Sequence, residues 1–519
     1  MINHLMMPYL AFWYRNFLSA SQSPVTTQKH ILRNIIAENI NTVFGIKHDF
    51  SGISSYKDFK DNVPVTDYSY YRNYIDAVCR NRDNILTSDN VNLMEPTSGT
   101  VSGTKLIPYT NKLQSEFKNG IYPWLYDLYK NHKALLGGTA YWSLSPVTDY
   151  SDNCSRPVGF QSDSQYLGLL GRVIERTMAV PSSVSAISDI KEWKIVTCLH
   201  LLSSSKLSLI SVWNPQFFTI LLNFIKYNKK ALLHKLSNQY NNIKCSKKRI
   251  RELRILLNAD SIDFQAVWPR LKLISCWADA YASLSVKTLK EFFPDIEIQP
   301  KGLISTEAFI SFPLTGYRGG VLSVLSHFFE FRSLKTGEIY TADQLKQGHE
   351  YTVIVTTSGG LYRYNLGDTV KITGFFNKLP MLIFTGRTGL TLDFFGEKLS
   401  ERFIARIIRS HILNNEDVRY ASFVPCFKKD FHYRIYCNGM NKDTNRFEKT
   451  IDRALCCNYH YRHARAIGQI APLRIIADNK DYNNLYIEYM RKKNKRLGDI
   501  KPVIISQDMH LWKFFEEEQ

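Results

Sequence analysis

Hydrophobic and polar positions divide the chain into short strand-like runs separated by longer helical stretches. Residues 90–94 and 296–299 mix apolar and polar side chains, apolar side chains dominate residues 271–277, and residues 351–357 are rich in valine and threonine, as β-strands are. Because strands alternate with helices, we expect an α/β fold whose sheet is at least partly parallel and covered on both faces. In such sheets ligands bind beyond the carboxyl ends of the strands.

Other stretches predict helices or leave two interpretations open. Residues 5–14 are apolar but short and contain a proline, so they predict a helix that packs on the body rather than a membrane span or a signal peptide. Residues 211–215 predict a strand that ends in a turn and opens a helical segment reaching residue 257. Residues 134–138 and 193–198 suit either buried strands or packed helix ends.

A break in the pattern at residues 384–389 predicts a domain boundary. Two glycines and an arginine there precede a segment that again alternates helices and strands. At 519 residues the chain exceeds the usual length of one compact unit. We therefore expect a large N-terminal domain, 1–386, and a small C-terminal domain, 387–519.

Charge and cysteine usage narrow the possible partners and compartment. The formal net charge of +19 favours anionic partners. The segment 226–254 contains many basic residues and one acid, Glu252, and residues 491–496 form a second basic cluster. We interpret the first as a solvated helix face and recognise no nucleic-acid-binding module. Nine scattered cysteines without a C-x-x-C pair argue against a disulfide framework and for a reducing compartment, the cytoplasm.

One loop, residues 97–105, has the composition of a phosphate-binding loop. It contains two glycines, five hydroxyl side chains and Lys105, after a predicted strand and before a helical pattern with Leu113 and Phe117. Backbone N–H groups, hydroxyls, a lysine and a helix start can together hold phosphate. The loop lacks the G-K-[ST] ending of a Walker motif, and a flexible connector is the alternative interpretation.

Two further pairs of residues could belong to the same chemistry. Thr306 and Glu307 follow a predicted strand, and a hydroxyl beside a carboxylate can hold a phosphate oxygen together with Mg²⁺. Asp368, in a predicted Gly-Asp turn, can accept hydrogen bonds from both ribose hydroxyls. Taken alone, the Thr-Glu dipeptide carries almost no information, and the Gly-Asp pair is more typical of a plain hairpin turn.

In their order along the chain, these motifs resemble those of the adenylate-forming enzymes, and most closely the auxin-responsive-promoter family of acyl-acid amido synthetases, in its bacterial branch. The segments that carry the resemblance are 95–100, 268–277, 299–303, 326–331, 356–368, 396–401, 460–469 and 497–502. The resemblance implies the adenylate-forming fold, with a large α/β domain and a smaller, mobile C-terminal α/β domain.

The resemblance also implies roles for individual residues. ATP phosphates would be held by the loop residues Thr97, Ser98, Gly99, Thr100, Ser102, Gly103 and Lys105. Thr306 would contact the α-phosphate, Glu307 would bind Mg²⁺, and Tyr362 and Asp368 belong to the nucleotide motif, with Asp368 on the ribose. Arg387 would lie at the domain junction. Lys501, with Lys105 and Thr306, would be catalytic, as the mobile lysine that enters the site for adenylation.

The sequence departs from the superfamily pattern at three places. Leu303 and Ile304 stand where many relatives have an aromatic-glycine pair that stacks on adenine. The usual hinge aspartate falls on Gly389, and a lysine common further on falls on Asp393. Adenine stacking and the hinge must therefore use other residues.

The resemblance predicts an ATP-dependent ligase that activates a carboxylic acid as acyl-AMP and joins it to an amino acid. An acyl-CoA ligase of the same superfamily and a non-catalytic nucleotide-binding regulator are the alternatives; a nucleic-acid-binding protein ranks last. Trp213, Tyr141 and Trp277 could line the acyl pocket, although large aromatics are more often core residues. The acid, the amine and the oligomeric state stay open.

Overall fold

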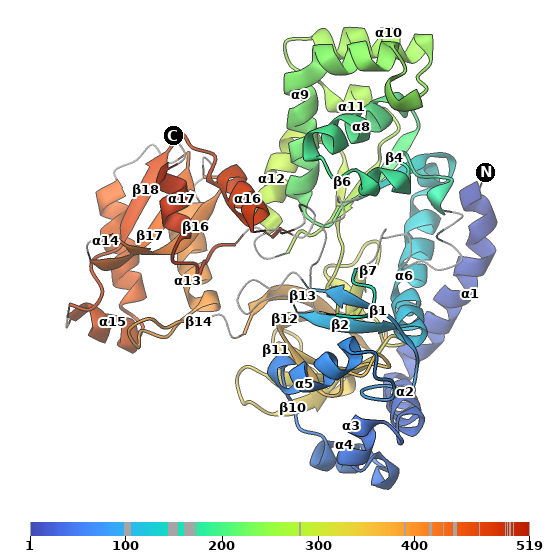
Figure 1. Cartoon of the computed structure of the whole chain (residues 1–519), viewed down its shortest axis with the longest axis vertical. Helices are drawn as coiled ribbons and strands as arrows, with labels where there is room; N and C mark the ends of the chain where they lie inside the picture. Colours follow the sequence, from blue (N-terminus) through green and yellow to red (C-terminus); the bar gives the residue numbers. More distant parts are fainter. Residues whose placement is uncertain are drawn as a thin grey trace. The chain divides into compact units, whose positions relative to one another are not determined.

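The computed structural model shows two compact units. It describes residues 2–97, 105–143, 154–159, 171, 174–279, 282–388, 391–414, 418–428, 430–439, 444–466, 468–493, 495, 497, 500–501 and 503–517. The first unit comprises Met1–Ala278 and Phe292–Thr385, and the second comprises Asp279–Glu291 and Gly386–Gln519. Figure 1 draws the whole chain, coloured along the sequence. The second unit thus contains an earlier segment that a division into two continuous domains leaves out.

Ten helices described in the first unit surround its sheets. They are α1 (Ile2–Gln22), α2 (Pro24–Glu38), α3 (Val43–Lys47), α4 (Tyr56–Asn62), α5 (Tyr68–Cys79), α6 (Asn111–Asn131), α8 (Ile190–Ser203), α9 (Pro215–Ser237), α10 (Lys247–Asn258) and α11 (Phe264–Val267). The predicted N-terminal helix is confirmed as α1, which lies beside α6 in Figure 1. Trp13 of α1 packs edge-on against Tyr122 of α6, with 5.2 Å between ring centroids. In the described part of the chain, no helix is long and apolar enough to cross a membrane.

A four-stranded parallel sheet supplies the α/β character of the first unit. Its order is β3-β4-β5-β6, and the strands are β3 (Thr139–Trp142), β4 (Leu207–Ser211), β5 (Leu273–Cys276) and β6 (Glu297–Pro300). Every residue of β4 and β5 is buried, so both faces of the sheet are covered. The strands expected at 271–277 and 296–299 are confirmed. The strand expected at 211–215 is wrong, because β4 ends at Ser211 and the next residues turn into α9.

A seven-stranded sheet, in which the assigned pairs are antiparallel, forms the rest of the first unit. Its order is β10-β9-β11-β12-β13-β8-β7. The strands are β7 (Ser311–Pro313), β8 (Gly320–Leu322), β9 (Phe328–Ser333), β10 (Ile339–Thr341), β11 (Glu350–Thr356), β12 (Tyr364–Phe376) and β13 (Leu379–Arg387). The strand expected at 351–357 is therefore confirmed as β11. Residues 134–138 and 193–198, for which the sequence suited either strands or helix ends, lie in a 3₁₀ turn and in α8, respectively.

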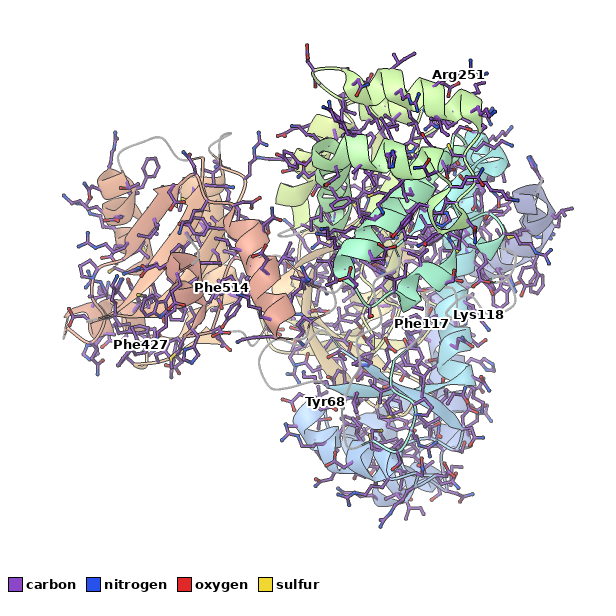
Figure 2. All side chains as sticks on the ribbon, turned by 45° about the horizontal axis from the view of Figure 1, so that its top comes forward. Tyr68, Phe117, Lys118, Arg251, Phe427 and Phe514 are labelled. Carbon is purple, nitrogen blue, oxygen red and sulfur yellow. The ribbon has the colours of Figure 1, made fainter. Side chains whose placement is uncertain are left out.

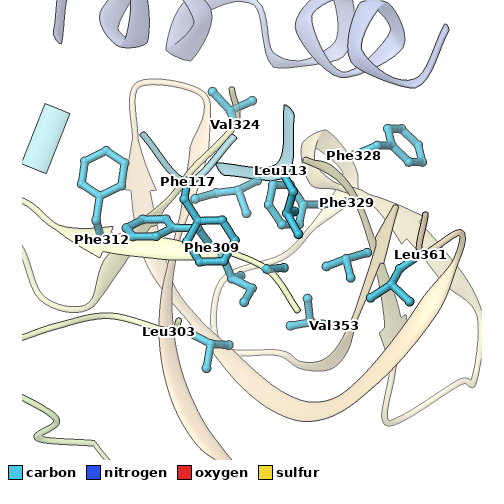
Figure 3. Close-up of a cluster of buried hydrophobic side chains, with 14 of the residues drawn as sticks. Leu113, Phe117, Leu303, Phe309, Phe312, Val324, Phe328, Phe329, Val353 and Leu361 are labelled. Carbon is cyan, nitrogen blue, oxygen red and sulfur yellow. The ribbon is translucent and has the colours of Figure 1, made fainter. Parts of the chain in front are cut away.

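Aromatic packing joins α6 to the large sheet. Figure 3 shows Phe117 among buried side chains that include Phe309 and Phe329. The rings of Phe117 and Phe309 lie 5.9 Å apart at a steep angle, an edge-to-face arrangement. Gly120 of α6 is needed for this approach, because a Cβ atom there would lie 2.1 Å from the Phe309 ring.

A buried ion pair connects the N-terminal helices to the large sheet. Arg363 donates from Nε and Nη2 to Glu330 of β9, both at 2.9 Å, and its Nη1 donates to the carbonyl oxygens of Val63 and Lys60. Tyr56 donates its hydroxyl to the same carboxylate at 2.7 Å. The Arg363 and Glu330 side chains are only 5% and 1% exposed. These bonds hold Arg363 in the left-handed conformation, with φ of 48°.

The second unit has its own small sheet and core. A three-stranded sheet is formed by β16 (Ala421–Phe427), β17 (Phe431–Asn438) and β18 (Arg474–Asp478), with β14 (Thr391–Leu392) and β15 (Leu399–Ser400) paired separately. Its helices are α12 (Ala282–Phe292, of which Phe292 belongs to the first unit), α13 (Glu401–Ile408), α14 (Thr444–Leu455), α15 (Tyr459–Ala466), α16 (Tyr482–Lys492) and α17 (Leu511–Glu517). The helices and strands expected after residue 400 are confirmed.

The buried ion pair gives a stability prediction. Glu330→Ala leaves the guanidinium of Arg363 buried without its carboxylate, and we expect a loss of about 3–5 kcal/mol in the free energy of unfolding. Denaturant titration followed by circular dichroism measures it. Glu338→Ala, at an exposed glutamate of the same unit, is the matched control and costs less than about 1 kcal/mol. A Glu330→Ala variant as stable as this control would contradict the assignment.

Candidate functional site

A hairpin presents the predicted phosphate loop. Its strands are β1 (Val91–Pro96) and β2 (Leu106–Thr110), which pair antiparallel with Pro96 opposite Leu106. The N–H of Thr97 donates to the carbonyl oxygen of Lys105 at 2.8 Å, so the two ends of the loop are held together. The predicted phosphate ligands Ser98, Gly99, Thr100, Ser102 and Gly103 lie outside the described residues.

The expected helix start does not follow the loop. The chain continues from the loop into β2, and α6 begins only at Asn111. Thr110, its N-cap, pairs with Val91 at the end of the hairpin opposite the loop. At about 3.3 Å per residue, the helix start is on the order of 15 Å from the loop, and a helix dipole acts only within about its first turn. The prediction of a strand-loop-helix arrangement is therefore wrong, because a strand, β2, follows the loop.

Lys105 lies over the start of α5. Its Nζ is 5.4 Å from the centroid of the Tyr68 ring, which is labelled in Figure 2. The Tyr68 hydroxyl accepts the Leu106 N–H at 2.9 Å and so fixes the residue next to the loop. A hydrogen bond from Ser69 lowers the pKa of the Asp67 carboxyl, and the positive charge of Lys105 lowers it further. Lys105 thus stays close to an ionised aspartate at the mouth of the loop.

Thr306 and Glu307 occupy the tip of a tight turn. The N–H of Ser305 donates to the carbonyl oxygen of Ala308 at 3.0 Å, which closes the turn. Both side chains at the tip are half-buried. The Tyr109 hydroxyl, from β2 of the hairpin, donates to the carbonyl oxygen of Thr306 at 3.0 Å. The two predicted motifs are therefore tied directly to each other.

Tyr364 marks the point at which three segments meet. It bridges to Thr66 just before α5, and its phenol is buried. Burial raises the pKa of this phenol well above its ordinary value, and the negative charge of Glu307 raises it further, followed by a contribution from Tyr68. The phenol therefore stays protonated beside the Glu307 carboxylate.

Asp368 lies in a bulge and not in a terminal turn. β12 begins at Tyr364, so the Gly-Asp pair is inside the strand. The pairing with β11 shifts there: Thr352 faces Thr369, whereas Ile354 faces Asn365. Gly367 takes a φ of 75°, which suits glycine, and its N–H donates to the Asn365 side chain at 3.0 Å. The expected turn is corrected to a bulge, which sets the direction of a nearly buried Asp368, 3% exposed.

Tyr362 is a core residue. Its side chain is fully buried, and its hydroxyl donates to the carbonyl oxygen of Leu86 at 2.6 Å. Its N–H and carbonyl oxygen both bond to the hydroxyl of Tyr71, and its ring stacks on Phe44 at 4.6 Å. These contacts use the whole side chain, so we do not retain Tyr362 among the nucleotide-contacting residues.

A buried histidine-glutamate pair supports the turn and was not predicted. His327 Nε2 accepts the N–H of Phe309 at 2.9 Å, so the ring proton is on Nδ1, which donates to Glu116 at 2.9 Å. The same carboxylate accepts the N–H of Ser358, just after β11. His327 lies in segment 326–331, which carries the resemblance, but the sequence contains no signal for its pairing with Glu116, because the two residues are far apart in the chain.

The remaining predicted residues lie further along the chain. Arg387 is the last residue of β13, and its side chain is exposed. Lys501 is an exposed residue of the second unit. Gly389, at the hinge position, lies outside the described residues. The roles of Arg387 and Lys501 stay predictions.

The carboxylates gathered here suit a metal that is held mainly by substrate. Among the described residues there is no group of three or more histidine, cysteine, aspartate or glutamate side chains that could hold a metal ion. Mg²⁺ in nucleotide sites binds one or two carboxylates together with phosphate oxygens. Glu307, a single carboxylate in a turn that is hydrogen-bonded to β2 of the hairpin, fits that donor set.

Two solved structures share the fold of this chain. The structure of AtGH3.15 acyl acid amido synthetase in complex with 2,4-DB matches with a TM-score of 0.84 at 18% identity, covering 97% of this chain and 95% of that chain. A second structure of GH3.15 acyl acid amido synthetase matches with a TM-score of 0.82 and the same coverage. This chain therefore has the fold of these two acyl acid amido synthetase structures, and the predicted fold class is confirmed.

Sequence comparisons identify the family. Models of the GH3 family match this chain at residues 14–298 (N-terminal domain), 320–387 (central domain) and 405–510 (C-terminal domain). The chain belongs to the GH3 family. Indole-3-acetic acid-amido synthetase GH3.4 of Arabidopsis thaliana is 23% identical, over 90% of this chain and 86% of that protein. GH3.15 of the same plant is 24% identical, over 83% and 80%.

The placement of Tyr362 can be tested against its predicted role. Tyr362→Phe removes the hydroxyl and leaves the Leu86 carbonyl oxygen without this donor, so we expect a loss of about 1–3 kcal/mol in the free energy of unfolding. Because the hydroxyl points into the core, ATP affinity measured by calorimetry stays within about twofold of wild type. A large loss of ATP affinity in a folded Tyr362→Phe variant would support the predicted role of Tyr362 in nucleotide binding.

Proposed function

We propose that this protein is an ATP-dependent acyl-acid amido synthetase. It joins a carboxylic acid to AMP and then transfers the acyl group to the amine of an amino acid. The observation that carries the proposal is that contacts connect three predicted motifs: the loop 97–105, the turn at Thr306 and Glu307, and the strand that contains Asp368. Tyr109 bonds to Thr306, Lys105 lies over Tyr68, and Glu307 acts on the phenol of Tyr364, four residues before Asp368. The named activities of its GH3 relatives support the same reaction.

Each step of the first half-reaction has a residue to serve it. The carboxylate attacks the α-phosphorus of ATP, and pyrophosphate leaves. The amides of the loop 97–105 and the ammonium of Lys105 hold the phosphates, and Thr306 holds an α-phosphate oxygen. Because these donors are fixed before the charge develops, they stabilise the transition state without reorganisation. Asp368 binds the ribose hydroxyls from the bulge in β12.

Glu307 is the residue that would hold Mg²⁺. When bound, the ion neutralises phosphate charge and polarises the phosphoryl group. The turn that carries Glu307 is fixed from two sides, by Tyr109 and by the His327 contact to Phe309. The carboxylate is thus positioned by groups that do not themselves contact the nucleotide.

The second half-reaction forms the amide. The amine attacks the acyl carbon, AMP leaves, and a proton is released. We assign Lys501 of the second unit to the adenylation step and treat residues 387–519 as the small domain that carries it. The scattered cysteines, without a C-x-x-C pair in the sequence, support a reducing compartment such as the cytoplasm.

The test of the proposal is pyrophosphate release from ATP and Mg²⁺ across a panel of carboxylic acids. Each acid is assayed without acceptor, with mixed amino acids, and with CoA. Release that rises with amino acids, together with an amide product in mass spectrometry, is the expected outcome. Release that rises only with CoA would favour an acyl-CoA ligase. ATP binding without release for any acid would favour a non-catalytic nucleotide-binding protein.

Asp368 and Lys105 should affect different kinetic constants. Asp368→Ala removes hydrogen bonds worth about 1.5–3 kcal/mol, so the KM for ATP rises by about 10- to 100-fold. Lys105→Ala removes transition-state stabilisation and lowers kcat by about 100- to 1,000-fold. Lys112→Ala, at a surface lysine paired with Glu38, is the matched control and leaves both constants near wild type. Wild-type kinetics in Asp368→Ala would remove the ribose assignment.

A further inference from the structure

Four tryptophans and a lysine gather at the carboxyl ends of the parallel strands. Trp142 ends β3, Trp277 and Lys301 directly follow β5 and β6, Trp213 lies just after β4, and Trp124 comes from α6. Trp213 and Trp277 lie 5.7 Å apart, and Trp124 and Trp142 lie 6.1 Å apart in an edge-to-face arrangement. This edge of a parallel sheet is where α/β proteins bind their ligands.

Lys301 is buried at the centre of this cluster. Lys301 is only 6% exposed. Its Nζ donates to Ser211 Oγ at 2.6 Å and lies 5.1 Å from the ring centroids of both Trp124 and Trp213. Its N–H donates to the carbonyl oxygen of Cys276 at 3.1 Å, which fixes the backbone to the neighbouring strand. The ammonium is therefore held in one place between two indoles.

The indole N–H of Trp142 is a further hydrogen-bond donor in the cluster. Trp142 Nε1 is buried and has no partner among the residues that the structure describes. Trp124 Nε1, by contrast, donates to Gln299 at 2.9 Å. A buried indole N–H without an acceptor costs free energy and indicates a missing acceptor. Trp142, Trp213 and Trp277 are only half-buried, so part of each ring still reaches solvent.

These groups together fit one kind of small molecule. Indole faces bind a flat, apolar body, and such aromatic contacts add to the burial of its surface. A fixed ammonium and an indole N–H bind an anionic or strongly accepting group, and a buried charged hydrogen bond is stronger than a neutral one. Lys301 precedes Thr306 by five residues. One short segment of chain would therefore contact both ends of a small acid.

We propose that this cluster binds the acyl acid, and that Lys301 and Trp142 select aromatic acids that carry a second carboxylate. The reacting carboxylate lies toward Thr306, and the second carboxylate bonds to Lys301 Nζ and Trp142 Nε1. This inference rests on the proposed function, because it takes a carboxylic acid to be the substrate. It goes further by naming the class of acid and the residues that distinguish it.

The test compares benzoate with phthalate, isophthalate and terephthalate on the full chain. Pyrophosphate release with mixed amino acids gives kcat/KM for each acid. We expect at least one diacid to exceed benzoate by about 10- to 100-fold in the wild-type protein. Lys301→Met brings this ratio to within threefold of unity, whereas Lys301→Arg keeps part of it. Lys272→Met, the same change at an exposed lysine, leaves the ratio unchanged.

Direct binding separates this inference from the proposed function. Quenching of tryptophan fluorescence by each acid, without ATP, reports occupancy of the cluster whether or not the protein is active. Diacid binding that is tighter than benzoate binding, and that is lost in Lys301→Met, supports the inference even if no acid gives pyrophosphate. Equal binding of the four acids by the wild-type protein, or an unchanged ratio in Lys301→Met, would overturn it. If Lys301→Met does not fold, Trp142→Phe replaces it with the same expected loss.

Discussion

The first unit depends on the buried contact between Arg363 and Glu330. The guanidinium bonds to a carboxylate on β9 and to backbone carbonyl oxygens before α5, so three distant parts of the sequence meet at one side chain. Immediately after Arg363 the chain pairs with Thr66 through Tyr364. This pairing places Tyr68 under Lys105 and sets the start of β12, in which Asp368 lies. The buried ion pair therefore helps to position the segments that form the site.

The site itself divides into a fixed frame and a loop. The frame consists of a hairpin held closed by Thr97 and Lys105 and a turn held by Tyr109 and His327. The dipole of α6 does not act at the phosphate loop, because α6 starts at the other end of the hairpin. Stabilisation of negative charge then comes from backbone amides and from single side chains, whose positions the frame defines.

Much of the fold follows from local patterns, whereas the details of the site do not. Runs such as 271–277 are apolar enough to specify β5, and the break near Arg387 shows in the positions of its glycines. β2 was missed because five buried residues between a loop and a helix carry too little periodicity. The turn assigned to Gly367 and Asp368 is a bulge, since the register depends on β11. The buried state of Tyr362 and the Glu116–His327 pair arise only from long-range contacts.

The helix between β5 and β6 changes how the two units are connected. Because Asp279–Glu291 belongs to the second unit, the chain passes between the units three times: after Ala278, after Glu291 and after Thr385. A single cut in the backbone therefore cannot free the second unit, and a chain that ended at Thr385 would keep one helix of a unit that it otherwise lacks. The first of these crossings lies next to Trp277, and the second, after Glu291, lies ten residues before Lys301. Trp277 and Lys301 thus flank, in sequence, the segment of the second unit that interrupts the first.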